Sequence, residues 1–348
     1  MQRDELLAKV ANGDMVSDPD LSGVDLSGAD LSGALFERVV FVRANLAGAK
    51  LDESTFSKCD FSGAQLGGAS LRHVTLHQST LFRTGLVQAD LRAASLVECS
   101  LRESDARALR GAGLDCVDCD LTGTSLAGAD LDMANLIRAK TEQLDLRGAN
   151  LHRVTLMRSD LRTTHLDGAR FDATLLLHSN LAGRSFRQVD FRKSQFFGAD
   201  LTGADFSEAN VSGCNFKDAH LVNARFDGAD ARQALLVGAR LDHSSWVGAR
   251  MKQAILQDAI APQADFSRVE LVEAVLVRGK FAGARFLGAN LTYADLSHAD
   301  LGGADFTGAR TFRAKLHQTK RAGAVIDTST ALGDDLELAE AELWEPSH

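Results

Sequence analysis

Apolar residues recur at every fifth position over most of the chain, from Leu21 to Leu316. Of the 60 positions in this series, 50 hold Leu or Phe, and the register does not slip. A small residue usually stands two positions before each large one, as in Ala29-Asp30-Leu31. An α-helix with 3.6 residues per turn and a strand with a period of two cannot keep such a stripe on one face. The pattern therefore predicts a backbone that turns by a fixed amount every five residues.

The residues between the apolar positions indicate which side chains point outward. A large and a small inward residue in each repeat would fill a narrow interior without voids. The two positions that follow the large residue are often Ser-Gly or Thr-Gly, as at Ser27-Gly28 and Thr202-Gly203. Glycine and small polar residues suit tight corners, where φ is positive or a side chain bonds to the local backbone.

The tandem pattern A-(D/N)-L-x-x resembles that of the pentapeptide-repeat family over residues 19–326. The resemblance implies an all-β fold, a single right-handed quadrilateral β-helix in which four pentapeptides form one coil of the solenoid. The 60 repeats would then make about 15 coils.

A 20-residue coil predicts that large residues 20 positions apart stack directly. One such column is aromatic in the C-terminal half, whereas it is aliphatic in the N-terminal half, as at Leu26 and Leu46. The predicted core ladder consists of Phe186, Phe206, Phe226, Trp246, Phe266, Phe286 and Phe306.

The two ends of the chain differ from the repeat, and the first and last coils of a solenoid need caps. Residues 1–18 are predicted to form an N-terminal capping helix, with Leu6, Leu7, Val10 and Ala11 on one helical face and Gly13 as its stop. Residues 327–348 carry a net charge of −7 and place Leu336, Ala339 and Leu343 at helical spacing, with Trp344 beside them. Three interpretations of this segment stay open: a cap on the last coil, a helix that pairs two chains into a homodimer, or an acidic tail.

The repeat is irregular at residues 104–119, where large and small inward residues are exchanged, as at Ala106, Leu109 and Gly111. One interpretation is local bending or widening of the coil. The other is a bulge or kink that forms a binding notch.

Candidate chemistry is sparse. The cysteines occupy inward positions, so packing accounts for them, including the pair Cys116-x-x-Cys119. Every histidine within the repeat falls at a position predicted to be outward, and none lies one full coil from another, so no two should stack on adjacent coils. The inward cysteines and outward histidines are, respectively, Cys59, Cys99, Cys116, Cys119 and Cys214, and His73, His77, His152, His165, His178, His220, His243, His298 and His317.

One basic row could bind a phosphate or a carboxylate, because Arg138, Arg158 and His178 follow one another at intervals of one coil. Random surface charge makes such a row as easily. The sequence holds no nucleotide-binding or metalloprotease motif, and a convex surface offers no cleft for a carboxylate pair. We therefore expect no catalytic residue, cofactor or metal.

Charge constrains the partner. Residues 21–326 sum to only +1, so the body lacks the basic surface needed for nucleic-acid binding. No apolar run is long enough to span a bilayer, and the first ten residues lack an apolar signal core. These features favour a cytoplasmic protein, with secretion that needs no cleaved signal as the alternative.

The favoured function is a non-enzymatic scaffold that binds proteins, and the resemblance extends to pentapeptide-repeat proteins that accompany bacterial type VI secretion. The alternative from the same family is mimicry of DNA at DNA gyrase, which gives resistance to topoisomerase inhibitors. Mimicry requires acidic charge along the shaft.

Overall fold

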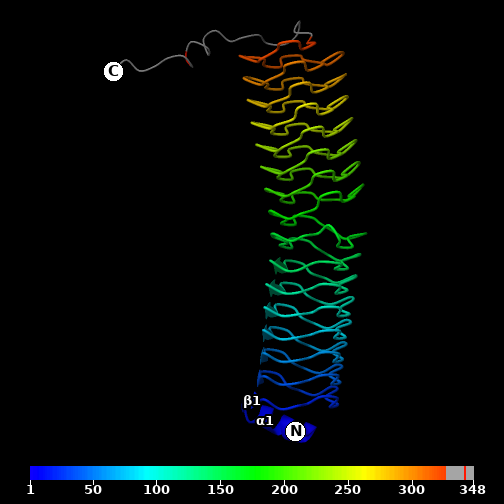
Figure 1. The fold of residues 1–348 in the computed structure, drawn as a ribbon, viewed down its shortest axis with the longest axis vertical. Helices are drawn as coiled ribbons and strands as arrows, with labels where there is room; N and C mark the ends of the chain where they lie inside the picture. The colour runs from blue at the N-terminus through cyan, green and yellow to red at the C-terminus, as the bar shows by residue number, and fades with distance from the viewer. Residues whose placement is uncertain (327–340, 342–348) are drawn as a thin grey trace, which may run out of the picture. The chain divides into compact units, whose positions relative to one another are not determined.

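The computed structural model describes residues 1–326 and residue 341. The chain divides into two compact units, Met1–Ser179 (unit 1) and Asn180–His348 (unit 2). Residues 1–326 contain one α-helix and, within unit 1, seven short strands (Figure 1). The all-β solenoid that the family resemblance implies is confirmed.

Unit 1 begins with helix α1 (Arg3–Ala11) and continues as a parallel sheet in which the strands follow one another in chain order. Successive strands pair in a register of one coil, as at Phe36↔Phe56 and Leu96↔Cys116. The strands are β1 (Val16–Ser17), β2 (Leu35–Glu37), β3 (Thr55–Ser57), β4 (Thr75–His77), β5 (Ser95–Val97), β6 (Asp115–Val117) and β7 (Asn135–Ile137).

The remaining sides of each turn are joined by single β-bridges with the same spacing. In unit 2 four consecutive bridges, starting from His220, Arg225, Asp230 and Leu235, connect one turn to the next. The seven strands of unit 1 define six turns, and the chain divides into two units. The predicted single β-helix of about 15 coils is therefore not supported.

Backbone hydrogen bonds explain why five residues form the repeating element. Within one repeat the amide of Leu46 donates to Gln65 O at 2.7 Å, and that of Gly48 donates to Gly67 O at 3.0 Å. The amide of Ala49 closes a local turn on Leu46 O at 3.0 Å. Because the sides of each turn pair with the turns before and after it, exposed sheet edges are confined to the ends of the stack.

The interior is filled by the two inward residues of each repeat. Almost every large residue of the series is buried, and so is the small residue that precedes it by two positions. Full burial of one Leu or Phe contributes about 1.5–3 kcal/mol. The aromatic column of unit 2 is a stack of rings, with centroids 4.8 Å apart for Phe206–Phe226 and 4.0 Å for Phe226–Trp246.

The irregular stretch at residues 104–119 keeps the register of the turns around it, with bridges Asp90↔Arg110 and Arg110↔Asp130. The bulge interpretation is therefore wrong. A Cβ built on Gly111 would lie 2.8 Å from Leu109 Cδ2. The large Leu109 side chain fills the space that Gly111 leaves, so the exchange of large and small residues conserves volume.

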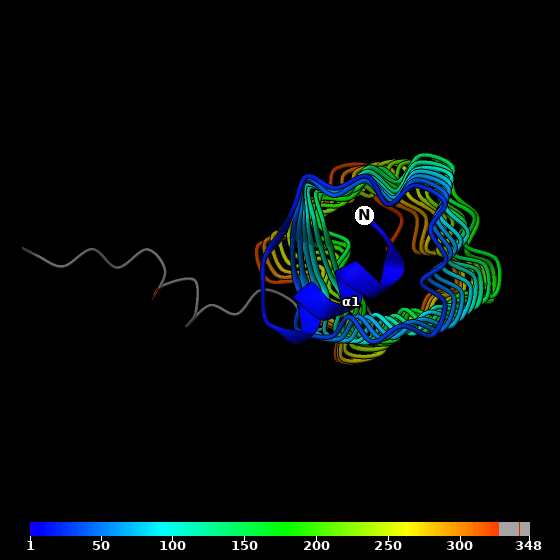
Figure 2. The same ribbon diagram turned by 90° about the horizontal axis from the view of Figure 1, so that it is seen from below.

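Helix α1 lies across the N-terminal end of unit 1 and contacts β1 (Figure 2). Leu6 is fully buried, Leu7 and Val10 are half-buried and Ala11 is exposed, so the predicted apolar face is narrower than expected. The helix ends as predicted before Gly13, which has a φ of +76°. Strand β1 lies inside the segment predicted to be the cap, because Val16 continues the five-residue series one repeat before Leu21.

At nearly every corner the residue two positions after the large one has a positive φ, from +47° at Gln318 to +72° at Gly323. Two of these corner residues are exposed alanines, Ala93 at +55° and Ala108 at +54°. A left-handed conformation costs an L-residue about 1–2 kcal/mol, whereas glycine adopts it freely.

We therefore expect Ala93→Gly and Ala108→Gly each to raise the free energy of unfolding by about 1 kcal/mol, as measured by urea denaturation. The control is the exposed Ala47, whose φ is not positive. Ala47→Gly should destabilise the protein by about 0.5–1 kcal/mol. Changes of the same sign at all three positions would contradict this account.

Candidate interaction surface

Three of the five side chains in each repeat point outward and form rows along the solenoid. In one repeat the outward positions are Asp30, which precedes the inward Leu31, and Ser32 and Gly33, which separate Leu31 from the inward Ala34. Residues at the same place in successive turns lie next to one another because the bridges keep a register of one coil. A binding site on the lateral surface is therefore formed by residues one coil apart, in addition to residues that are adjacent in sequence.

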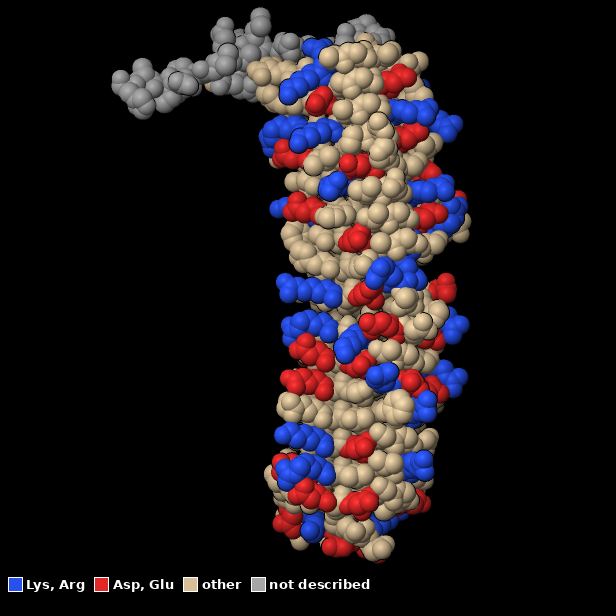
Figure 3. Space-filling view, viewed as in Figure 1, with Lys and Arg blue, Asp and Glu red and all other residues tan. Residues whose placement is uncertain are grey.

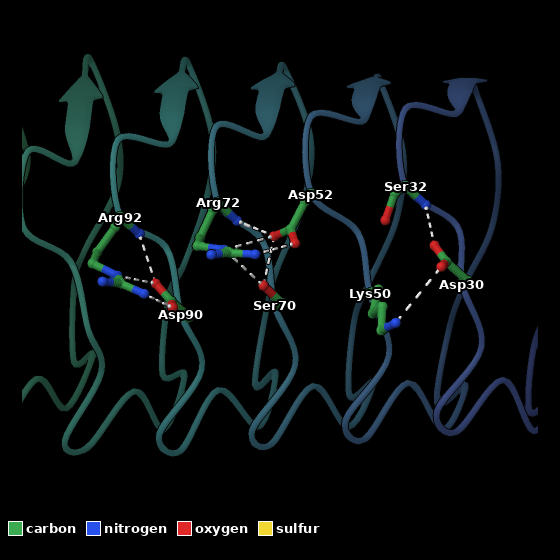
Figure 4. A network of polar contacts seen from close by, with 8 residues as sticks. All are labelled: Asp30, Ser32, Lys50, Asp52, Ser70, Arg72, Asp90 and Arg92. Atoms are coloured by element: carbon green, nitrogen blue, oxygen red, sulfur yellow. Dashed lines mark hydrogen bonds and ion pairs between the residues drawn. The ribbon is translucent and has the colours of Figure 1, made fainter.

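One face of unit 1 carries a network of charged residues (Figure 4). The ammonium of Lys50 lies 3.8 Å from Asp30, on the preceding turn. Asp52 accepts hydrogen bonds from Ser70 Oγ at 2.6 Å and Arg72 Nη2 at 2.9 Å, both from the following turn. In this network the charges neutralise one another across turns.

A second kind of pair lies within a single corner. The side chain of Arg92 donates from Nε and Nη2 to the two oxygens of Asp90, at 2.8 and 2.6 Å. Donor and acceptor residues are two positions apart, so the corner geometry itself aligns the guanidinium with the carboxylate. The same arrangement occurs at Asp105–Arg107, Asp145–Arg147, Asp160–Arg162 and Asp230–Arg232.

The pKa values of these aspartates reflect the pairing. Partial burial alone would raise the pKa of Asp52, but hydrogen bonds from Arg72 and Ser70 outweigh it and lower the pKa to about 2. The hydrogen bonds from Arg147 lower the pKa of Asp145 to about 2 as well. Arg92 lowers the pKa of Asp90 in the same way. These carboxylates are ionised at neutral pH and are poor proton donors.

This pairing predicts a loss of stability in acid. Unfolded Asp52 takes up a proton near its ordinary pKa of 3.8, and the folded protein takes it up only near 2. The stabilisation is therefore complete above about pH 4 and is lost as the pH falls from about 4 to 2. We expect Asp52→Asn to lower stability at pH 7 and to flatten the acid branch of a thermal-denaturation curve. Parallel acid branches for the wild type and the variant would contradict the prediction.

The predicted basic row is partly neutralised in the structure. Arg138 donates to both carboxylate oxygens of Asp118, at 2.7 and 2.5 Å. Arg138, Arg158 and His178 all lie at corners with positive φ, so they occupy equivalent places in the turns of unit 1. Anion binding by this row stays a prediction.

The five cysteines are buried and form no disulfides, as packing residues should be. Burial raises the pKa of the Cys59 thiol to about 11. A hydrogen bond with Cys119 and burial raise the pKa of Cys99. Cys99 and Cys119 belong to adjacent turns, which the bridge Ser100↔Asp120 joins, a relation that the sequence motif Cys116-x-x-Cys119 conceals. The raised pKa values make the thiols of Cys59 and Cys99 poor nucleophiles at neutral pH.

The prediction that every histidine within the repeat lies at an outward position is wrong for His317, and this residue contacts a histidine of the preceding turn. The rings of His298 and His317 lie 5.3 Å apart and nearly perpendicular, and only 3% of His317 is exposed. The amide of His298 donates to His317 O at 2.8 Å, with the same offset in sequence as other bonds between turns, such as that from Leu46 to Gln65. His298 and His317 stand at different places in their repeats, two and one positions after the large residue, so a search at intervals of one full coil misses their contact.

Unit 2 carries an outward row of apolar residues where the repeat usually has a polar one. Leu235, Ile255 and Val275 are joined by successive bridges, and 37% of Leu235 is exposed. Val237 and Val277 are half-buried and lie two residues further along the first and third turns of the row. We call these five residues the apolar strip. The apolar strip was not predicted from the sequence. Three apolar residues one coil apart, at positions that are usually polar, would have indicated it.

Polar residues line a shallow hollow at the corner that precedes the strip. The hollow has a volume of about 390 Å³ and is lined by Ser212, Arg232, Gln233, Lys252 and Gln253. The side-chain amide of Gln233 donates to Gln253 at 3.2 Å, and that of Gln253 donates to Glu273 at 2.8 Å. Arg232 is held by Asp230. The strip and the hollow together form a surface with apolar, donor and acceptor groups side by side.

Elsewhere the two signs of charge are interspersed on both units (Figure 3). Among the described residues, no cluster of three or more acidic, histidine or cysteine side chains could hold a metal ion. The described part of the chain also contains no helix with the length and hydropathy to span a membrane.

Parallel bridges that recur once per coil, two inward residues in each repeat and positive-φ corners define a protein of the β-solenoid class. The chain belongs to the pentapeptide-repeat family. The family model, described as pentapeptide repeats, matches eight copies, at residues 20–57, 40–78, 59–96, 115–153, 164–203, 199–236, 234–271 and 270–308.

Several solved structures are similar to this chain. HetL, a pentapeptide-repeat protein involved in heterocyst differentiation regulation from the cyanobacterium Nostoc sp. strain PCC 7120, is 24% identical over 91% of this chain and 97% of its own, with a TM-score of 0.22. Rfr23 from the cyanobacterium Cyanothece 51142 is 28% identical over 30% and 67%, with a TM-score of 0.23. QnrB1, a plasmid-mediated fluoroquinolone resistance protein, is 24% identical over 53% and 91%, with a TM-score of 0.27. A search of curated proteins found no match.

Proposed function

We propose that this protein is a non-enzymatic scaffold that binds another protein through the apolar strip of unit 2. The observation that carries the proposal is the bridged row Leu235–Ile255–Val275 on the outer surface. A contiguous apolar row rimmed by polar residues is typical of a protein–protein contact. The partner that fits has an apolar centre, flanked by groups that hydrogen-bond to the Gln233–Gln253–Glu273 row.

The charges of the described surface support a binding role over catalysis. Every described aspartate whose pKa departs clearly from its ordinary value has it lowered. A general acid needs the opposite shift, which brings its pKa near the working pH. Cytoplasmic location is part of the same proposal, supported by five buried cysteines that form no disulfides. The predicted link to type VI secretion has no support in the comparisons and is not part of it.

The test replaces the three central residues of the strip together, as Leu235→Lys, Ile255→Lys and Val275→Lys. The matched control adds the same side chain at outward bridge positions on other sides of unit 2, as His220→Lys, Ser245→Lys and Asn290→Lys. Tagged proteins of equal thermal stability are used for quantitative affinity purification. Proteins captured by the wild type should be retained by the control and reduced at least tenfold by the strip variant. Equal capture by both variants would refute the role of the strip.

The second candidate is DNA mimicry, and the charge of unit 1 is the observation that favours it. Residues 1–179 carry a net charge of −6, whereas residues 180–326 carry +4. Many of the acidic groups in unit 1 are paired with Arg or Lys, as at Asp52–Arg72, which weakens their likeness to a row of phosphates. A gyrase supercoiling assay tests the candidate. Stoichiometric protein that inhibits gyrase, or protects it from a quinolone, would establish mimicry, and no effect in either assay would exclude it.

A further inference from the structure

The last described turn of unit 2 is basic. Residues 306–326 contain five positively charged side chains and no Asp or Glu. Four of them are exposed and Arg321 is half-buried. Lys315 lies 3.8 Å from Asp295 of the preceding turn, with most of its side chain exposed. The five residues, which we call the basic turn, are Arg310, Arg313, Lys315, Lys320 and Arg321.

The interior of the solenoid is open at the same end. The inward residues Ala304 and Phe306 are buried, whereas Ala324 and Ile326 are half-buried. No further turn follows among the described residues, so these last inward positions lack one layer of packing. At the N-terminal end of unit 1 helix α1 supplies that layer, and Val16 and Leu21 there are buried.

A second basic feature lies beside this turn. A hollow of about 420 Å³ is lined by Arg278, Lys280, His298, Asp300, Gln318 and Lys320. Arg278 is paired with Asp258 at 2.8 Å. Backbone β-bridges join Asp300 to Lys280 on the turn before it and to Lys320 on the turn after it. This row of side chains therefore has two cations for one carboxylate. The basic surface therefore extends from the last turn along one side of unit 2.

We propose that residues 327–348 of this chain dock on the basic turn and the open end of unit 2. The segment carries seven acidic residues and no Lys or Arg, and it follows Ile326 directly. When extended, it could span up to about 70 Å, which is enough to reach the hollow. Leu332, Leu336 and Leu338 offer apolar groups for the half-exposed Ala324 and Ile326.

Covalent attachment gives residues 327–348 a higher occupancy of the basic turn than a free acidic peptide of the same composition would have. A short linker gives an effective concentration in the millimolar range. A free acidic partner has to exceed that concentration, or bind more tightly, to reach the basic turn. The tethered acidic segment is therefore the favoured occupant of the basic turn.

Tryptophan fluorescence tests the proposal in the full-length protein. The chain has two tryptophans, Trp246 in the aromatic stack and Trp344 in the acidic segment. Trp246→Phe continues the phenylalanine column and leaves Trp344 as the reporter. At low salt we expect blue-shifted emission and protection of Trp344 from acrylamide. Salt at 0.5 M, or replacement of the five basic-turn residues by Gln, should shift the emission to the red and raise quenching at least threefold.

The matched control replaces five exposed cations of unit 1 by Gln and should leave Trp344 protected. These residues are Arg43, Lys58, Arg102, Arg110 and Arg170. Circular dichroism checks that each variant is folded. Solvent-exposed Trp344 at low salt, or protection that survives both salt and the basic-turn replacements, would overturn the proposal. Protection that disappears on dilution would also overturn it, because a second copy of the chain would then be the occupant.

Discussion

Phe226→Ala is expected to lower the free energy of unfolding of unit 2 by about 3–5 kcal/mol. The Phe226 side chain is fully buried. Its ring lies 4.8 Å from that of Phe206 and 4.0 Å from that of Trp246, parallel to both, and it meets Phe216 edge-on at 5.7 Å. Removing the ring leaves a cavity between two turns that are fixed by backbone hydrogen bonds and cannot collapse into it.

Two measurements check this expectation. Urea denaturation followed by circular dichroism gives the loss of stability. In a Trp344→Phe background, the emission of Trp246 should change because one of its stacking neighbours is gone. The control is Phe312→Ala, since Phe312 is 50% exposed, and its loss should cost less than about 1 kcal/mol. Equal effects of the two substitutions would mean that the column does not carry the stability of unit 2.

Gly279→Ala is expected to destabilise the protein by about 1–3 kcal/mol, the usual cost of overpacking a core. A Cβ at this position would lie 2.3 Å from Phe281 Cε2 and 3.1 Å from the carbonyl oxygen of Leu276. Gly279 stands where most repeats have alanine, and the ring of Phe281 occupies the space that a methyl group would take. The backbone oxygen cannot move without breaking the local turn.

A double-mutant cycle tests the cause. Phe281→Leu replaces the ring with the side chain most common at that position, so Gly279→Ala should cost less in this background. Gly85→Ala is the control, because a Cβ there would lie 2.7 Å from the Oε1 end of the flexible Gln65 side chain, which can move away. A loss at Gly279 that is the same in both backgrounds would show that Phe281 is not the obstacle.

Sequence periodicity could identify the inward positions because they obey a local rule. In every repeat the backbone places one large and one small side chain inside, so large and small residues recur in the sequence at intervals of five. At Leu109 and Gly111 the large and the small residue have exchanged places. Their combined volume is conserved, so the register continues. The rule missed the contact between His298 and His317, because the two residues stand at different places in their repeats and are not one full coil apart.

The outward surface could not be predicted to the same extent. Arg138 was expected to offer a charge to a ligand, but Asp118 on the preceding turn engages it. The row of Leu235, Ile255 and Val275 was not predicted, because a single outward apolar residue in one repeat is ordinary. Their significance arises from the bridges that join them. Leu336, Leu343 and Trp344 lie outside the described residues, so their predicted roles in capping or pairing stay predictions.

The inward residues and the helix before Gly13 could be predicted from the amino-acid sequence because the five-residue rule and the glycine stop are both local, and the family resemblance added the solenoid class. Which outward side chains meet, where charges cancel and how the chain divides into two units became apparent only in the folded protein. These properties depend on contacts between residues about one coil apart, and such contacts exist only once the turns are stacked.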